Sequence, residues 1–242
     1  MPDALPAPVH VAVIDSGVHP AHPHIAAGQL EPGVSVARDG SLAWGQEATA
    51  DCLGHGTAVT AAIQQWAPAA MIVPVRVFSS ELRTSPRALV AAIDWAADAG
   101  VDLINLSLGT PVKAHGPVIE AAVRRAMAAG AVLIAARAVD GAPCFPGALP
   151  ETLGVGLDWD CPREGWRLAA GADGEAYVTA SGYPRPIPGF PQRRNLHGIS
   201  FAVANVTGFA AAMLGKGGAP MSGPERLRWL REGFSAGVEA VA

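Results

Sequence analysis

Short apolar runs alternate with longer amphipathic segments along most of this 242-residue chain. Runs rich in Val, Ile and Leu are typical of buried strands, and apolar residues at three- and four-residue spacing are typical of helices. The pattern predicts strands at residues 9–14, 71–78, 101–108, 131–136 and 153–157. It predicts helices at residues 58–66, 86–100, 117–129, 201–214 and 223–234.

The order of these elements predicts the fold class. Strands alternate with helices at the spacing of βαβ units, and the strands are apolar on both faces. Strands of this kind form a mainly parallel sheet that helices cover on both sides. We therefore expect an α/β fold with three layers, α/β/α. Because no linker interrupts the chain, residues 1–242 are expected to form one domain.

Local signals refine three of the segments. The helix at 86–100 has Ser85 as N-cap, Pro86 in its first turn and Gly100 at its end. Residues 18–50 are rich in His, Pro and Gly and are expected to form loops. The last helix is amphipathic, and we expect its three arginines to face solvent: Arg226, Arg228 and Arg231.

Composition excludes several classes of protein. Half of the residues are hydrophobic and 16% are charged, so the chain is not disordered. The net charge is −4 and no long basic run occurs, so nucleic acid is not an expected partner. No segment reaches the roughly 20 uninterrupted apolar residues of a membrane helix, and we expect no membrane association.

Three histidines, His19, His22 and His24, lie close enough in sequence to suggest a metal site. Prolines separate them and no acid accompanies them, so a polar surface loop is favoured. We expect neither a metal nor another cofactor.

The N-terminus and the cysteines bear on the cellular compartment. Residues 1–8 contain neither the basic segment nor the apolar segment of a secretory signal. Cys52, Cys144 and Cys161 are odd in number and lack metal-type spacing, which favours a reducing compartment. We therefore expect a cytoplasmic protein.

The segment from His197 to Gly208 carries the strongest indication of chemistry. A short polar approach, His197-Gly198, leads directly into an apolar helix, which puts Ser200 at the helix start. Backbone N–H groups are unpaired there and the helix dipole is positive, so developing negative charge would be stabilised. Ser is also a preferred N-cap residue, and Ser200 taken alone fits that structural role better.

An acid and an imidazole occur in matching contexts. Asp15 ends the first strand, and His55 precedes the first helix. An acid, an imidazole and a hydroxyl on three separate elements are the components of an acyl-transfer triad. A thiol nucleophile at Cys52 is a weaker alternative, because a small buried Cys is far commoner.

Several motifs resemble those of one enzyme family. Val13–Gly17, Gly54–Thr57 and Gly198–Ala202 resemble the three signature segments of the subtilisin-like serine proteases, or subtilases. Asn105–Gly109 resembles the substrate-binding strand of that family, and residues 146–156 resemble the stretch that follows its oxyanion region. The order of acid, imidazole and hydroxyl is also that of subtilisin. The resemblance covers most of the chain.

The resemblance implies an activity and a set of site residues. The chain would be a serine endopeptidase of peptidase family S8 that cleaves a peptide or protein through an acyl-enzyme. Asp15 would orient the imidazole, His55 would be the general base, and Ser200 would be the nucleophile. An extended substrate would bind along Ser107, Leu108, Gly109, Ala136 and Arg137.

The chain departs from the family at the oxyanion hole, which would involve Ser200, Ala138 and Arg137. Ala138 stands where the family has an Asn whose amide donates to the oxyanion. Loss of that amide from subtilisin itself lowers kcat by roughly 10²–10³, or about 3–4 kcal/mol. The Ser200 N–H and the helix dipole would remain, and the Arg137 guanidinium could replace the missing donor. We expect slow catalysis.

Further departures surround the substrate pocket and the nucleophile. Arg137 replaces a glycine of the family's pocket for the residue before the cleaved bond. Its side chain could fill that pocket, select an acidic side chain or point outward, and Asp140 is close enough in sequence to neutralise it. Ile199 replaces Thr and Ala204-Asn205 replace Pro-His, where Asn205 could compensate in part.

The sequence thus predicts a serine endopeptidase with a restricted peptide or precursor substrate. Two alternatives remain open. One is an impaired pseudo-protease that binds an extended peptide, and the other is a non-hydrolytic acyl transferase or ligase on the same fold. A guanidinium of Arg137 directed at Ser200 would favour an enzyme, whereas one that fills the pocket would favour binding.

Overall fold

The structure is a computed structural model that describes residues 8–171, 174–217 and 220–237. Nine strands form one sheet in the order β10-β11-β9-β6-β5-β1-β4-β2-β3. All neighbouring pairs from β11 to β2 are parallel, whereas the two edge strands β10 and β3 are antiparallel to their neighbours. The strands of this sheet are β1 (His10–Asp15), β2 (Val34–Val36), β3 (Leu42–Trp44), β4 (Met71–Arg76), β5 (Leu103–Leu106), β6 (Val132–Ala136), β9 (Leu153–Leu157), β10 (Trp166–Ala170) and β11 (Ala176–Ala180). A separate short hairpin pairs β7 (Ala138–Val139) with β8 (Ala142–Pro143).

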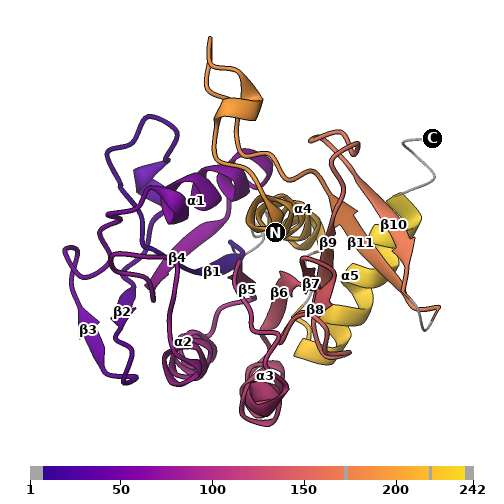
Figure 1. Ribbon diagram of the computed structural model, residues 1–242, viewed down its shortest axis with the longest axis horizontal. Coiled ribbons are helices and arrows are strands. Elements are labelled where there is room, and N and C mark those ends of the chain that lie inside the picture. The colour runs from indigo at the N-terminus through magenta and orange to yellow at the C-terminus, as the bar shows by residue number, and fades with distance from the viewer. Residues whose placement is uncertain (1–7, 172–173, 218–219, 238–242) are drawn as a thin grey trace, which may run out of the picture.

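Helices cover both faces of the sheet. The helices α1 and α4 lie on one face, and α2 and α3 lie on the other, with α5 beside α3 (Figure 1). Their bounds are α1 (His55–Trp66), α2 (Pro86–Asp98), α3 (Gly116–Ala128), α4 (Ile199–Gly217) and α5 (Gly223–Gly237). Short 3-10 turns occur at η1 (Ala27–Gln29), η2 (Lys113–His115) and η3 (Gln192–Arg194). The predicted three-layer α/β/α fold with a mainly parallel sheet is confirmed.

The structure differs from the sequence-based expectations at the sheet edges. Residues 18–50, expected to be loops, contain β2 and β3, whose three-residue runs are too short for a periodic signal. The antiparallel edge pair β10–β11 was also missed, because its side chains are partly exposed and not uniformly apolar. β5 ends at Leu106 rather than at 108, since residues 107–109 leave the sheet.

One expected surface residue is mostly buried. The side chain of Arg226 is 11% exposed, and its guanidinium bonds the carboxylate of Asp102 at 2.7 Å. The expectation that Arg226 faces solvent was therefore wrong, whereas Arg228 and Arg231 are exposed as expected. Helical spacing places Arg226 on the side of α5 that faces the start of β5. There the Asp102 carboxylate and the Gly130 carbonyl accept hydrogen bonds from its guanidinium.

The helix α4 is the centre of the core. Twelve of its residues are buried, and it packs on α1 and along β5, β6, β9 and β11. Its length and composition would allow it to cross a membrane, but 61% of its apolar window is buried inside the fold, as expected for the core helix of a globular protein. Its N-terminal end thereby has a fixed position against the strands.

The aromatic contact between α5 and β10 provides a test of this packing. Phe234 is fully buried and meets Trp166 edge-on, with 5.1 Å between the ring centroids. Replacing Phe234 with Ala should leave a cavity and lower the free energy of unfolding by about 3–4 kcal/mol. Urea denaturation measures this change. The matched control Phe190→Ala, in an exposed loop, should change it by less than about 0.5 kcal/mol. Equal effects of the two substitutions would contradict the packing.

Candidate active site

The predicted site residues gather where the central strands of the sheet end, at their carboxyl ends. Asp15 is the last residue of β1, residues 107–109 follow β5, and residues 137–138 follow β6. The strands β1, β5 and β6 are parallel neighbours, so their carboxyl ends meet. Ser200 lies in the first turn of α4, directly beside the end of β5.

Asp15 and His55 form a buried pair. The Nδ1 atom of His55 lies 2.7 Å from Oδ1 of Asp15, and the Ser16 N–H donates to the same oxygen at 2.7 Å. The side chain of Asp15 is fully buried and that of His55 is 12% exposed. Oδ2 of Asp15 is buried and has no hydrogen-bond partner among the described residues. The imidazole of His55 is therefore the side-chain partner of this buried carboxylate among the described residues.

A turn organised by Asp51 positions His55 at the start of α1. The carboxylate of Asp51 accepts hydrogen bonds from the backbone N–H groups of Leu53, Gly54 and Thr57 and from the Thr57 hydroxyl, at 2.6–2.9 Å. Gly54 is left-handed, with φ 77°, which suits glycine. Sequence reasoning missed Asp51, although an acid just before a helix is a signal for such a cap.

The hydroxyl of Ser16 joins the two halves of this arrangement. It donates to Asp51 Oδ1 and accepts from the Gly56 N–H, both at 2.8 Å. A Cβ atom at Gly56 would lie 2.2 Å from the Gly17 carbonyl oxygen, so only glycine permits this approach. The end of β1 and the start of α1 are thus held together around the Asp15–His55 pair.

The two carboxylates determine the charge state of the imidazole. Burial lowers the pKa of His55, but the hydrogen bond and negative charge of Asp15, with a smaller effect of Asp51, outweigh burial and raise the pKa above 6.5. Burial raises the pKa of Asp51, but its hydrogen bonds, above all those from Thr57, outweigh this and lower the pKa. Asp51 therefore remains ionised beside His55.

The hydroxyl of Ser200 is bonded to the backbone just after β5 and not to the imidazole. Gly198, with φ 142°, leads into α4, and Ser200 Oγ donates to the Ser107 carbonyl at 3.3 Å. Within the described part of the chain, no hydrogen bond joins Ser200 to His55, although the ring of the next residue, Phe201, lies 5.6 Å from the imidazole. The expected contact of Asp15, His55 and Ser200 is therefore only half formed.

A large cleft opens beside Ser200. It has a volume of about 960 Å³ and is lined by residues that include Ala138, Leu157, Trp159, Tyr177, Gly198 and Ile199. Ala138 lies in β7 and brings no side-chain donor. Ala136 is buried in β6, and Ser107–Gly109 lie half-buried beside Ser200, outside the lining of this cleft. The structure thus brings only Arg137 and Ala138 of the predicted strand residues into the cleft.

Arg137 lies in the wall of this cleft. Its guanidinium lies 4.7 Å from the centroid of the Tyr177 ring and 3.9 Å from the Glu175 carboxylate. Among the described residues, the carboxylate within 4 Å of the guanidinium is that of Glu175, on the loop before β11. These contacts hold the guanidinium against β11 and the loop before it.

Asn205 has a structural role away from the nucleophile. Its amide donates to the carbonyls of Ser181 and Tyr183 and accepts from the Trp66 ring N–H at 2.9 Å. The guanidinium of Arg163 packs over Trp66, and burial lowers the pKa of Arg163 to about 10. These contacts fix the segment that approaches Ser200, a role that sequence spacing did not reveal.

The three loop histidines line a second cleft of about 400 Å³, on the His55 side of the site. Arg185 reaches across and donates to the His24 carbonyl at 3.1 Å, and the rings of His22 and His24 lie 5.3 Å apart. Among the residues that the structure describes, no group of three or more His, Cys, Asp or Glu is arranged to hold a metal. Cys52 is exposed and lines the same cleft.

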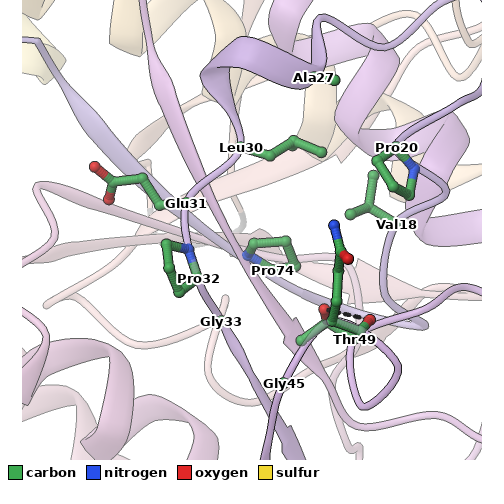
Figure 2. A pocket seen from close by; sticks show the side chains of 11 residues that line it. Val18, Pro20, Ala27, Leu30, Glu31, Pro32, Gly33, Gly45, Thr49 and Pro74 are labelled. Atoms are coloured by element: carbon green, nitrogen blue, oxygen red, sulfur yellow. Dashed lines mark hydrogen bonds between the residues drawn. The ribbon is translucent and has the colours of Figure 1, made fainter.

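A third pocket, of about 370 Å³, lies beyond the turn that follows β1 (Figure 2). Its lining is mostly apolar and includes Val18, Leu30 and Pro74. The carboxylate of Glu31 points away from the pocket in Figure 2 and lies 3.3 Å from His10. No acid–imidazole pair like that of Asp15 and His55 lies among the residues that line this pocket.

Comparison with known proteins identifies the family of the chain. The profile of the subtilase family (Peptidase_S8) matches residues 7–156. Subtilisin DY from Bacillus licheniformis is 27% identical over 223 residues, which cover 86% of this chain and 77% of that protein. Subtilisin BL from Lederbergia lenta is 28% identical over 218 residues, which cover 84% and 75%. The chain belongs to the subtilase family, a family of serine proteases.

Solved structures share the fold. Sphericase superposes with a TM-score of 0.74 at 24% identity, covering 93% of this chain and 82% of that one. The nisin leader peptidase NisP from Lactococcus lactis gives 0.66 at 18% identity, with 93% and 82% covered. A lanthipeptide protease gives 0.67 at 20% identity, with 93% and 79% covered.

The Asp15–His55 pair makes a testable electrostatic prediction. An NMR titration of the His55 ring should give an inflection above pH 6.5, since Asp15 stabilises the imidazolium. Asp15→Asn should move this inflection down, because burial then dominates. The pair's contribution to the free energy of unfolding should be complete below the pKa that His55 has in the unfolded chain. It should be lost as the pH rises through the raised pKa of His55 in the folded protein. Asp39→Asn, at an exposed carboxylate, is the control, and an unchanged inflection in Asp15→Asn would contradict the pairing.

Proposed function

We propose that this protein is a serine endopeptidase in which Asp15, His55 and Ser200 form the catalytic triad. The observation that carries the proposal is the buried Asp15–His55 pair, held at the same sheet edge as a serine in the first turn of α4. Membership of a family of serine proteases supports the same chemistry.

The proposed reaction assigns one step to each residue. Ser200 Oγ attacks the scissile carbonyl while His55 Nε2 takes its proton, and the carbonyl oxygen gains the negative charge. His55 then gives the proton to the leaving amine, and water hydrolyses the acyl-enzyme by the same route in reverse. Asp15 holds Nδ1–H and stabilises the imidazolium throughout.

Ser200 must first leave the Ser107 carbonyl. Its hydrogen bond of 3.3 Å is long for a hydroxyl donor and therefore weak. Catalytic contacts of this kind commonly tighten only when substrate binds. We propose that binding at residues 107–109 turns the hydroxyl towards His55.

The proposed oxyanion hole is poorer than that of other members of the family. The Ser200 N–H and the positive end of α4 remain as stabilising groups. The guanidinium of Arg137 lies beside Glu175 and Tyr177, and we propose no donation from it to the oxyanion. Slow catalysis follows from this arrangement.

The proposed substrate is a restricted peptide or precursor in the cytoplasm. The cleft of about 960 Å³ offers Leu157, Trp159 and Tyr177 to a large side chain before the cleaved bond. Three similar folds belong to proteins named for leader-peptide or lanthipeptide processing, which motivates a precursor peptide. The three unpaired cysteines are compatible with a reducing compartment.

Peptide binding without catalysis is a second candidate. The observation that favours it is the hydrogen bond of Ser200 to Ser107 in place of His55, together with Ala138. An acyl transferase or ligase would use the same acyl-enzyme with an amine in place of water. Trapping of the acyl-enzyme separates binding from both enzymatic candidates.

Reaction with a fluorophosphonate probe tests the triad. The wild type should be labelled slowly, and both Ser200→Ala and His55→Ala should abolish labelling, since the nucleophile and its base are then missing. The labelling rate should rise as the pH passes the raised pKa of His55. Cys52→Ser is the matched control and should label like the wild type. Absence of labelling at every pH at which the fold persists would favour the peptide-binding candidate.

Restoring the family amide tests the oxyanion hole. Ala138→Asn should raise the rate of acylation by an activated ester at least about tenfold, because loss of this donor from subtilisin itself costs roughly 10²–10³. Ala138→Leu is the control for side-chain size without a donor. Equal rates for these two variants would show that Ala138 does not face the oxyanion.

A further inference from the structure

A chain of hydrogen bonds connects the middle of α4 to its first turn by way of β5. Thr207 Oγ1 donates to Asn105 Oδ1 at 2.9 Å, and Asn105 Nδ2 donates to Ser107 Oγ at 3.1 Å. Ser107 Oγ then donates to the Ser200 carbonyl at 3.3 Å. Thr207 and Asn105 are fully buried, so water does not compete for the bond between them.

The proton of Thr207 is required by Asn105. The Thr207 hydroxyl also lies 2.9 Å from the Val203 carbonyl one turn earlier, but it has a single proton to donate. The Val203 carbonyl can accept a backbone hydrogen bond within the helix instead. Thr207 is the donor that the described residues offer to Asn105 Oδ1. A buried acceptor without a donor is costly, which favours the bond to Asn105.

Ser107 and Ser200 are joined by two reciprocal hydrogen bonds. Ser107 Oγ donates to the Ser200 carbonyl, and Ser200 Oγ donates to the Ser107 carbonyl. Two hydrogen bonds thereby join the first turn of α4 to the residue after β5, and the bond from Ser107 Oγ is the one that persists when Ser200 turns to His55. Because Ala138 supplies no amide, the position of the Ser200 N–H matters more for the oxyanion here than in a site with two donors.

We propose that Thr207 is a positioning residue for Ser200, acting through Asn105 and Ser107. The inference rests on the proposed function, because it assigns Thr207 a share in the rate of acylation of Ser200. Thr207 itself touches neither the substrate nor the reacting atoms. Its removal should loosen the turn that carries the nucleophile without changing the Asp15–His55 pair.

The test compares Thr207→Val, Thr207→Ser and the control Thr60→Val. Thr60 is a buried threonine of α1 that takes no part in the chain of bonds. With a fluorophosphonate probe, Thr207→Val should lower the maximal labelling rate about tenfold, because the loss of one buried hydrogen bond lets the turn that carries Ser200 leave its reactive position. The probe concentration for half-maximal rate and the pH inflection should stay unchanged. Thr207→Ser, which keeps the hydroxyl, should restore the rate, and Thr60→Val should match the wild type.

The outcomes separate this inference from the proposed function. A normal maximal rate in Thr207→Val, with lowered thermal stability alone, would overturn the positioning role. If the wild type does not react, the proposed function fails, and amide hydrogen exchange of residues 199–201 then decides the inference. Faster exchange there in Thr207→Val than in Thr60→Val supports the chain of bonds, and equal exchange overturns it. Should Thr207→Val not fold, Asn105→Ala provides the same comparison.

Discussion

The contact of the His55 imidazole with the buried Asp15 carboxylate is the interaction on which the site depends. A carboxylate without water is costly unless a charge or donors compensate it, and one oxygen of Asp15 has no partner among the described residues. The imidazole supplies that compensation, and in return it is held in one orientation with a raised pKa. Asp51, Ser16 and Gly56 serve this contact by fixing the start of α1 against the end of β1.

The helix α4 supplies the second half of the site. Its burial along the sheet holds its first turn beside the end of β5, where Ser200 meets Ser107. The substrate side is less conventional for a subtilase, since Ala138 lacks a donor and Arg137 is occupied by Glu175 and Tyr177. The proposed slow catalysis rests on this combination of an Asp15–His55 pair with a position 138 that lacks the family's amide.

The sequence predicted the layers and the central parallel strands, and it placed Asp15 at the end of the first strand and Ser200 at the start of a helix, as in the structure. These features follow from long apolar runs and from motifs that keep their order. The edge strands β2, β3, β10 and β11 were missed because short, partly exposed strands carry little periodic signal. The burial of Arg226, the pairing of Arg137 with Glu175 and the bond of Ser200 to Ser107 depend on contacts between distant segments, which spacing along the chain does not encode.

The measurement that tests the central claim most directly is mapping of the acyl group after brief reaction with an activated ester and an acid quench. The account predicts that mass spectrometry of the digested protein finds the acyl group on the peptide that contains Ser200. It also predicts that the adduct disappears in His55→Ala. An adduct on Cys52, or no adduct at all, would contradict the claim that Ser200 is a nucleophile activated by the Asp15–His55 pair.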